Sequence, residues 1–193
     1  MTNNRLTPKP HAQWIQIMSG YTKFAIVGVG RIGNCILQEL LKEKDVGIVK
    51  EVAVLTRQVR YPSHDQVVHD ILSTLLAVET KGSNKTIQGD AKVIEVDYSN
   101  DASIKHALTG VDVVISTVPI AVVHVQVKIA AAAKDAGVQL FVPSEFGGKW
   151  EARIEGMFAT KANIRDKLKA LDIPIAAFYT GLWADCPWVP YVS

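Results

Sequence analysis

The sequence predicts an α/β fold built on a doubly wound parallel β-sheet. Short apolar runs of strand length alternate with segments of helical period along most of the chain. The runs are mostly β-branched and apolar throughout, which is typical of parallel strands covered on both faces. A glycine-rich turn directly follows the first of them. We expect strands at residues 24–27, 52–55, 93–96, 111–115, 138–142 and 173–179.

Helices are expected between these strands, at residues 31–44, 102–108, 120–136 and 151–171. The first carries an apolar stripe at helical spacing, and Gly110 and Gly137 are placed to end the second and third. The stretch from residue 60 to 92 is longer than one crossover needs. It predicts an amphipathic helix near residues 67–76, followed by a polar loop.

Length and composition exclude several classes of protein. The 193 residues suffice for one packed domain, and 48% are hydrophobic against 21% charged. A net charge of +2 favours neither nucleic acid nor a membrane surface as partner, and no apolar run approaches a span of about 20 residues. Two cysteines and five histidines show no metal-ligand spacing, so we expect no metal site. The cysteines also make no disulfide framework, and we expect a cytoplasmic protein.

The turn after the first strand carries the most specific motif in the chain. It has the form G-x-G-x-x-G and opens the first helix, as in Rossmann-type dinucleotide-binding folds. The first glycine permits the tight turn, the second lets a pyrophosphate approach the backbone, and the third lets the helix sit close to the strand. A glycine turn without a ligand is the alternative. The predicted cofactor-binding residues here are Gly28, Val29, Gly30, Arg31, Ile32 and Gly33.

The end of the second strand predicts which dinucleotide is bound. Sites for NAD usually place an acidic residue there, to bind the ribose 2′-hydroxyl. This chain has Thr56 and Arg57 instead. Because a guanidinium pairs well with a phosphate, Arg57 favours NADP(H) over NAD(H). An ordinary solvated arginine on a loop is the alternative.

Three more strand ends fall at the same predicted edge, where ligands of open α/β sheets bind. Asp97 and Tyr98 follow the third strand, and we expect Asp97 to lie beside the adenine. The segment from Thr117 to Pro119 is expected at the ribose and nicotinamide. Turn chemistry alone is the alternative for each. The cofactor-binding candidates at these ends are Asp97, Tyr98, Thr117, Val118, Pro119, Pro143, Glu145 and Phe146.

Lys161 is the candidate catalytic residue. The expected helix at 151–171 has an apolar stripe through Met157, Ile164, Leu168 and Leu171, and the spacing places position 161 within it. A lysine on a buried face either extends outward to solvent or faces a polar cavity. In the second case it would hold the nicotinamide ribose or act as acid or base.

In their order along the chain, these segments resemble the isoflavone reductase-like branch of the NmrA-like family, which are atypical short-chain dehydrogenases. The resemblance runs from about residue 23 to 185 and is carried by residues 28–33, 56–57, 97–98, 143–147 and Lys161. It implies a catalytic role for Lys161, NADP binding by Arg57, and reduction of a small, often aromatic, metabolite by hydride transfer. Met157 stands where ordinary short-chain dehydrogenases have tyrosine.

Family members continue well past the point where this chain stops. We therefore expect residues 23–193 to form an NAD(P)-binding NmrA-like domain without most of the C-terminal substrate lobe. Residues 1–22 are expected to be a disordered extension. Two functions remain open. One is the cofactor domain of an NADPH-dependent reductase. The other is a dinucleotide-sensing regulator that binds a protein partner without turnover.

Overall fold

A single parallel sheet forms the centre of the computed structural model, which describes residues 20–57, 89–148 and 156–181. Its five strands lie in the order β3-β2-β1-β4-β5, so the chain moves outward from β1 and then returns to its other side. The gap between the carboxyl ends of β1 and β4 is the switch point where such sheets bind ligands. The strands are β1 (Lys23–Val27), β2 (Glu51–Arg57), β3 (Lys92–Val96), β4 (Val113–Ser116) and β5 (Leu140–Val142).

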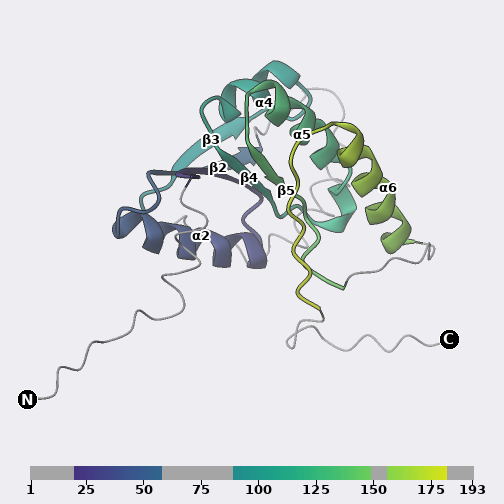
Figure 1. Cartoon of the computed structure of the whole chain (residues 1–193), viewed down its shortest axis with the longest axis horizontal. Coiled ribbons are helices and arrows are strands. Elements are labelled where there is room, and N and C mark those ends of the chain that lie inside the picture. The colour runs from purple at the N-terminus through teal and green to yellow at the C-terminus, as the bar shows by residue number, and fades with distance from the viewer. Residues whose placement is uncertain (1–19, 58–88, 149–155, 182–193) are drawn as a thin grey trace, which may run out of the picture.

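Helices cover both faces of this sheet (Figure 1). On one face lies α2 (Arg31–Asp45), and on the other lie α4 (Asp101–Leu108), α5 (Val125–Asp135) and α6 (Met157–Ala170). A short 3₁₀ turn, η1 (Ile120–Val122), precedes α5. Alternate residues of a strand point to opposite faces of the sheet, so each strand can pack against both layers of helices. The chain thus has the predicted doubly wound α/β fold.

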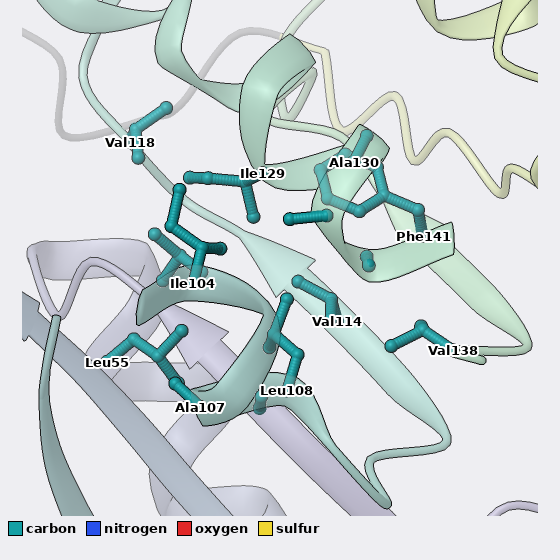
Figure 2. Packing of buried hydrophobic residues seen from close by; sticks show 14 of the residues in the cluster. Leu55, Ile104, Ala107, Leu108, Val114, Val118, Ile129, Ala130, Val138 and Phe141 are labelled. Atoms are coloured by element: carbon teal, nitrogen blue, oxygen red, sulfur yellow. The ribbon is translucent and has the colours of Figure 1, made fainter. Parts of the chain in front are cut away.

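Two hydrophobic clusters show this alternation directly. Ala25 and Val27 of β1 belong to the cluster under α4, α5 and α6, whereas Phe24 and Ile26 belong to the cluster under α2. Figure 2 shows the larger cluster, in which side chains of α4 and α5 meet those of β2, β4 and β5. Its fully buried members include Ile104, Leu108, Val114, Ile129 and Phe141. Each large side chain buried in this way stabilises the fold by about 1.5–3 kcal/mol.

The prediction of a sixth strand at residues 173–179 is wrong except for a single residue pair. Only Ile175 of the 173–179 run forms a bridge, with Phe141 of β5. The Phe141 N–H donates to the carbonyl of Pro174 at 2.9 Å, and the Ala176 N–H donates back to Phe141 at 3.1 Å. Beyond this point Phe178 and Tyr179 are exposed, so the run diverges from the sheet after one pair.

The helix expected at 120–136 is interrupted. η1 ends at Val122, and α5 begins at Val125. The helix expected at 67–76, the start of the helix expected at 151–171, and residues 1–19 of the expected disordered extension lie outside the described residues. Within the described ranges, no helix has the length and apolarity needed to cross a membrane.

Asp112 links the starts of β1 and β4 by hydrogen bonds, at the amino edge of the sheet, which lies opposite the candidate site. Its carboxylate accepts the backbone N–H groups of Thr22 at 2.7 Å and Lys23 at 2.9 Å, and the side-chain amide of Gln139 at 3.2 Å. Burial by itself raises the pKa of Asp112, but the hydrogen bonds from Thr22 and Lys23 together with the Lys23 charge lower that pKa below its usual value.

We expect Asp112→Ala to lower the free energy of unfolding by about 2 kcal/mol near neutral pH, because hydrogen bonds to a charged group are lost. The pKa of Asp112 is lower folded than unfolded, so its contribution is present above the unfolded pKa. It disappears as the pH falls through the folded pKa. Urea unfolding of both proteins at stepwise lower pH measures this. Asp135→Ala, at an exposed position of α5, is the control; a difference from wild type that persists undiminished in acid would contradict the assignment.

Candidate functional site

The glycine turn after β1 closes tightly against the end of β4. Gly28 has a φ of +89°, a conformation that glycine adopts readily. The Thr117 hydroxyl donates to the Gly28 carbonyl at 2.5 Å, and the Thr117 N–H donates to the Val27 carbonyl at 2.8 Å. A Cβ atom on Gly33 would collide with the Gly28 carbonyl and with the Thr117 hydroxyl. Position 33 therefore requires glycine for close packing of α2, as the sequence motif predicts.

The N-terminus of α2 is open toward the switch point. Gly30 is its N-cap and supplies no side-chain cap, and the first turn contains no acidic residue. A Cβ atom on Gly30 would meet nothing within 4 Å. The first turn of a helix has N–H groups without partners in the helix and a positive dipole end. An uncapped, open end of this kind suits a phosphate group.

Thr56 and Arg57 lie at the carboxyl end of β2, beside the open turn in the sheet order. Arg57 is exposed, and Thr56 is half-buried with its hydroxyl 3.4 Å from the Ile94 carbonyl. The Tyr98 hydroxyl donates to the Leu55 carbonyl at 3.3 Å, which joins the β3 end to β2. Burial raises the pKa of Tyr98 well above its usual value, while the nearby Arg57 charge opposes this rise. Tyr98 is therefore neutral and supports the strand that ends at Arg57.

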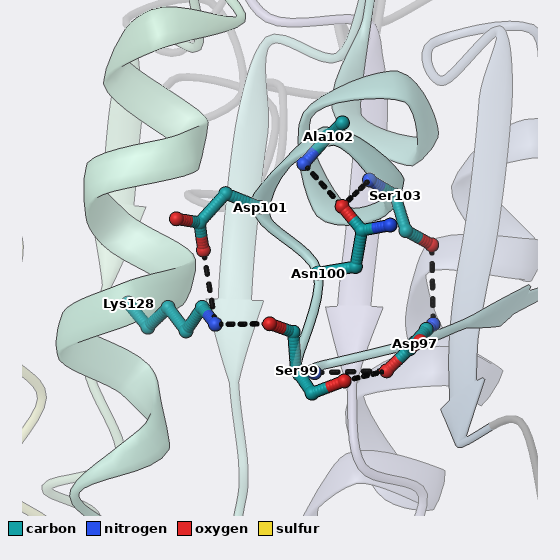
Figure 3. Close-up of polar contacts among 7 residues, drawn as sticks. All are labelled: Asp97, Ser99, Asn100, Asp101, Ala102, Ser103 and Lys128. Atoms are coloured by element: carbon teal, nitrogen blue, oxygen red, sulfur yellow. Dashed lines mark hydrogen bonds and ion pairs between the residues drawn. The ribbon is translucent and has the colours of Figure 1, made fainter.

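Asp97 organises the turn between β3 and α4 (Figure 3). One of its carboxylate oxygens accepts both the N–H and the hydroxyl of Ser99, at 2.9 and 2.5 Å. Asn100 caps α4 by accepting two backbone N–H groups of its first turn. Lys128 of α5 donates to the Ser99 carbonyl at 2.7 Å and pairs with Asp101 at 3.0 Å. Asp97 thus has the turn role that was the alternative in the sequence analysis. Its expected place beside the adenine stays a prediction.

Lys161 reaches the turn that follows β5. Its amine donates to the main-chain carbonyl of Glu145 at 2.7 Å. Burial lowers the pKa of Lys161, the Glu145 carboxylate opposes this change, and Arg165 adds to it. The predicted buried stripe of α6 is present at Ile164 and Leu168, which are 4% and 0% exposed. Lys161 therefore lies at the carboxyl edge of the sheet and is only half-buried.

Glu145 forms a buried ion pair beside this lysine. Its side chain is 5% exposed, and one carboxylate oxygen lies 3.7 Å from the guanidinium of Arg165. Burial raises the pKa of Glu145, whereas the charges of Lys161 and Arg165 lower it. Arg165 also donates to the Tyr179 hydroxyl at 3.3 Å. Three charged groups thus surround the β5 turn.

Two polar residues at this edge escaped the candidate set. Gln126 of α5 is 1% exposed, and its side-chain oxygen accepts the Ser144 N–H at 2.9 Å. The Ser144 hydroxyl donates to the Val118 carbonyl at 2.8 Å. The pattern that singled out Lys161 could also have found Gln126, because Gln126 shares a helical face with the buried Ile129 and Ala133.

All the predicted site residues therefore fall at one edge. The glycine turn, Arg57, the β3 and β4 ends, the β5 turn and Lys161 follow each other along the carboxyl ends of the strands. A parallel sheet in this order with a glycine turn at its switch point defines a Rossmann-type fold. The family model for the NmrA-like family matches residues 22–186, and the chain belongs to that family.

Curated relatives are similar over part of the chain. Eugenol synthase 2 of Clarkia breweri is 43% identical over 96 residues, which are 46% of this chain and 29% of that protein. The phenylcoumaran benzylic ether reductase Betv6 of Betula pendula is 39% identical over 118 residues, which are 57% of this chain and 36% of that protein. The chain thus spans about a third of the length of these relatives.

A solved structure, that of AtPrR2 with NADP⁺ and (+)-pinoresinol, is similar over more of the chain. It has 29% sequence identity and a TM-score of 0.58, with 81% of this chain and 49% of that chain covered. The crystal structure of an isoflavone reductase gives a TM-score of 0.58 at 23% identity, over 82% of this chain and 49% of that chain. This second likeness supports the fold alone.

Proposed function

We propose that this chain is the cofactor-binding part of an NADPH-dependent reductase that transfers hydride to a small aromatic metabolite. The observation that carries the proposal is that three features suited to a dinucleotide lie at the same edge of the sheet. An open helix N-terminus, an arginine at the end of β2 and a half-buried lysine lie along one row of strand ends. The names of the relatives, which include ether reductases and a structure with NADP⁺, point to the same chemistry.

The residues at this edge fit a dinucleotide. The space beside Gly30 leaves room for a pyrophosphate against the α2 N-terminus. Arg57 would pair with a 2′-phosphate, and the segment from Thr117 to Pro119 would line the nicotinamide side. Bound NADPH would supply the hydride. Gly30, the N-cap of α2, has no side chain that would occupy this space.

Lys161 is proposed as the residue that moves a proton. Its amine is anchored by the Glu145 carbonyl, and burial lowers its pKa, which favours proton transfer by an amine. The Glu145 carboxylate keeps the site from becoming strongly cationic when Lys161 and Arg165 are both charged. Lys161 would donate a proton to the reduced substrate, or hold the nicotinamide ribose through a hydrogen bond.

Cofactor choice gives a direct test. We expect Arg57→Ala to weaken NADPH binding by about 1–3 kcal/mol, as for a lost hydrogen bond to a charged group, and to leave NADH binding nearly unchanged. Fluorescence titration with both cofactors measures this. Lys50→Ala, an exposed site before β2, is the control for a general loss of positive charge. Equal losses for both cofactors would rule out a 2′-phosphate contact.

Turnover distinguishes the proposed function from its alternative. NADPH oxidation in the presence of a panel of aromatic enones supports a reductase. In a protein that also carries a complete substrate lobe, tight NADPH binding without oxidation of any panel member would favour a dinucleotide sensor with a protein partner. We also propose a cytoplasmic location, since Cys35 is a free and exposed thiol, which the reducing cytosol preserves.

A further inference from the structure

The turn after β5 has a backbone that its own sequence does not favour. The Glu145 N–H donates to the Pro143 carbonyl at 2.8 Å, so the chain reverses within three residues. Phe146, directly after it, has a φ of +25°. A positive φ is uncommon for a bulky residue and persists only where surrounding contacts hold it. Something outside the turn must therefore fix its shape.

Two hydrogen bonds hold Ser144 of this turn to other parts of the fold. Gln126 of α5 accepts the Ser144 N–H at 2.9 Å, and the Ser144 hydroxyl donates to the Val118 carbonyl, after β4, at 2.8 Å. Gln126 is 1% exposed, so this bond is shielded from water and is costly to break. Together the two bonds tie α5 and the β4 end to the turn after β5.

The same turn supplies the acceptor for Lys161. The residue after Ser144 is Glu145, whose main-chain carbonyl accepts the Lys161 amine at 2.7 Å. That carbonyl belongs to the peptide plane that leads into Phe146, so its direction depends on the backbone of the turn, in which Phe146 has a φ of +25°. A change in the contacts of Ser144 therefore changes where Lys161 is anchored.

We infer that Gln126 is a positioning residue for Lys161, acting through Ser144 and the Glu145 carbonyl. This inference rests on the proposed function for its meaning in catalysis, but the contact chain itself does not need a bound cofactor. Gln126 is a buried residue of α5 and is not one of the predicted cofactor-binding residues. Its role is to keep the strained turn in the one shape that presents the carbonyl to the lysine.

The test measures Lys161 itself. Competitive labelling of lysines with acetic anhydride across a pH series, read by peptide mass spectrometry, gives a midpoint for each amine. The charged groups beside Lys161 are Glu145, from the β5 turn, and Arg165, from its own helix. Burial has a larger effect on the pKa of Lys161 than either charge, and it lowers that pKa. The exposed Lys167 of the same helix is the internal reference.

Gln126→Met keeps the size of the side chain and removes the acceptor. We expect the Lys161 midpoint to shift upward as the turn relaxes and the amine gains water. The matched control is Ile129→Val, which trims a fully buried side chain one turn further along α5. It destabilises the core without touching the turn, and its Lys161 midpoint should remain that of the wild type.

An unchanged Lys161 midpoint in folded Gln126→Met, or an equal shift in Ile129→Val, would overturn the inference. If Gln126→Met does not fold, Ser144→Ala removes the bond to Val118 and takes its place, with the same upward shift expected and an unchanged midpoint counting against it. The labelling needs no NADPH. A shift in a chain that binds no NADPH would therefore uphold the positioning role and contradict only the proposed function.

Discussion

Gly30→Val is expected to abolish dinucleotide binding while the fold survives. Gly30 has ordinary extended dihedral angles, so a larger residue fits its backbone, and a Cβ atom there meets no protein atom within 4 Å. The valine side chain would instead fill the space where a pyrophosphate approaches the α2 N-terminus. We expect a loss of at least about 100-fold in NADPH affinity, equivalent to roughly 2.8 kcal/mol.

Gly33→Ala is the matched comparison, since Gly33 is the third glycine of the same motif and lies on the buried face of α2. Its Cβ atom would collide with the Gly28 carbonyl, a backbone atom that cannot rotate away. We expect this variant to lower the free energy of unfolding by about 1–3 kcal/mol, as overpacking does. Thermal unfolding by circular dichroism and NADPH titration of both variants separate the two effects. Native binding in folded Gly30→Val would mean that the glycine turn is not the site.

The fold could be predicted from the sequence because its decisive features are local. Each of the five strands contains a short apolar run, and the glycine motif marks the turn after β1. The run at 173–179 has the same composition, yet a strand also needs a partner along its length. β5 pairs with only one of its residues, Ile175, and composition cannot report how far two segments stay together.

The candidate site was predictable where one residue breaks a pattern, as Lys161 breaks an apolar stripe. Asp97 and Thr117 were located correctly at the edge of the sheet, but their hydrogen bonds within the protein were not foreseen. The bond of Asp97 is local, to Ser99, but the bond of Thr117 depends on where segments distant in sequence meet. The Thr117 hydroxyl meets a carbonyl 89 positions earlier in the chain. The same reason hid Ser144, whose partners lie on two other elements.

In a protein that carries a complete substrate lobe, Lys161→Ala is expected to reduce the rate of hydride transfer by about 10²–10⁴-fold, the range for loss of a general acid or base. Stability should change little, because the lysine is half-buried and its amine bonds to a main-chain carbonyl. The Glu145 carboxylate keeps Arg165 as its partner at 3.7 Å, so the substitution leaves no isolated buried charge. NADPH affinity should fall far less than the rate if the role is proton transfer, and as much as the rate if the role is only to hold the ribose.

Stopped-flow measurement of NADPH oxidation, with an aromatic substrate that the wild type reduces, tests this prediction. Lys167→Ala removes an exposed lysine from the same helix and should retain the wild-type rate. Because burial lowers the pKa of Lys161, the wild-type rate should also change with pH at a lower value than an exposed lysine would give. That pH dependence should vanish in Lys161→Ala. If it persists there at an undiminished rate, another group moves the proton, and Lys161 serves only to brace the β5 turn.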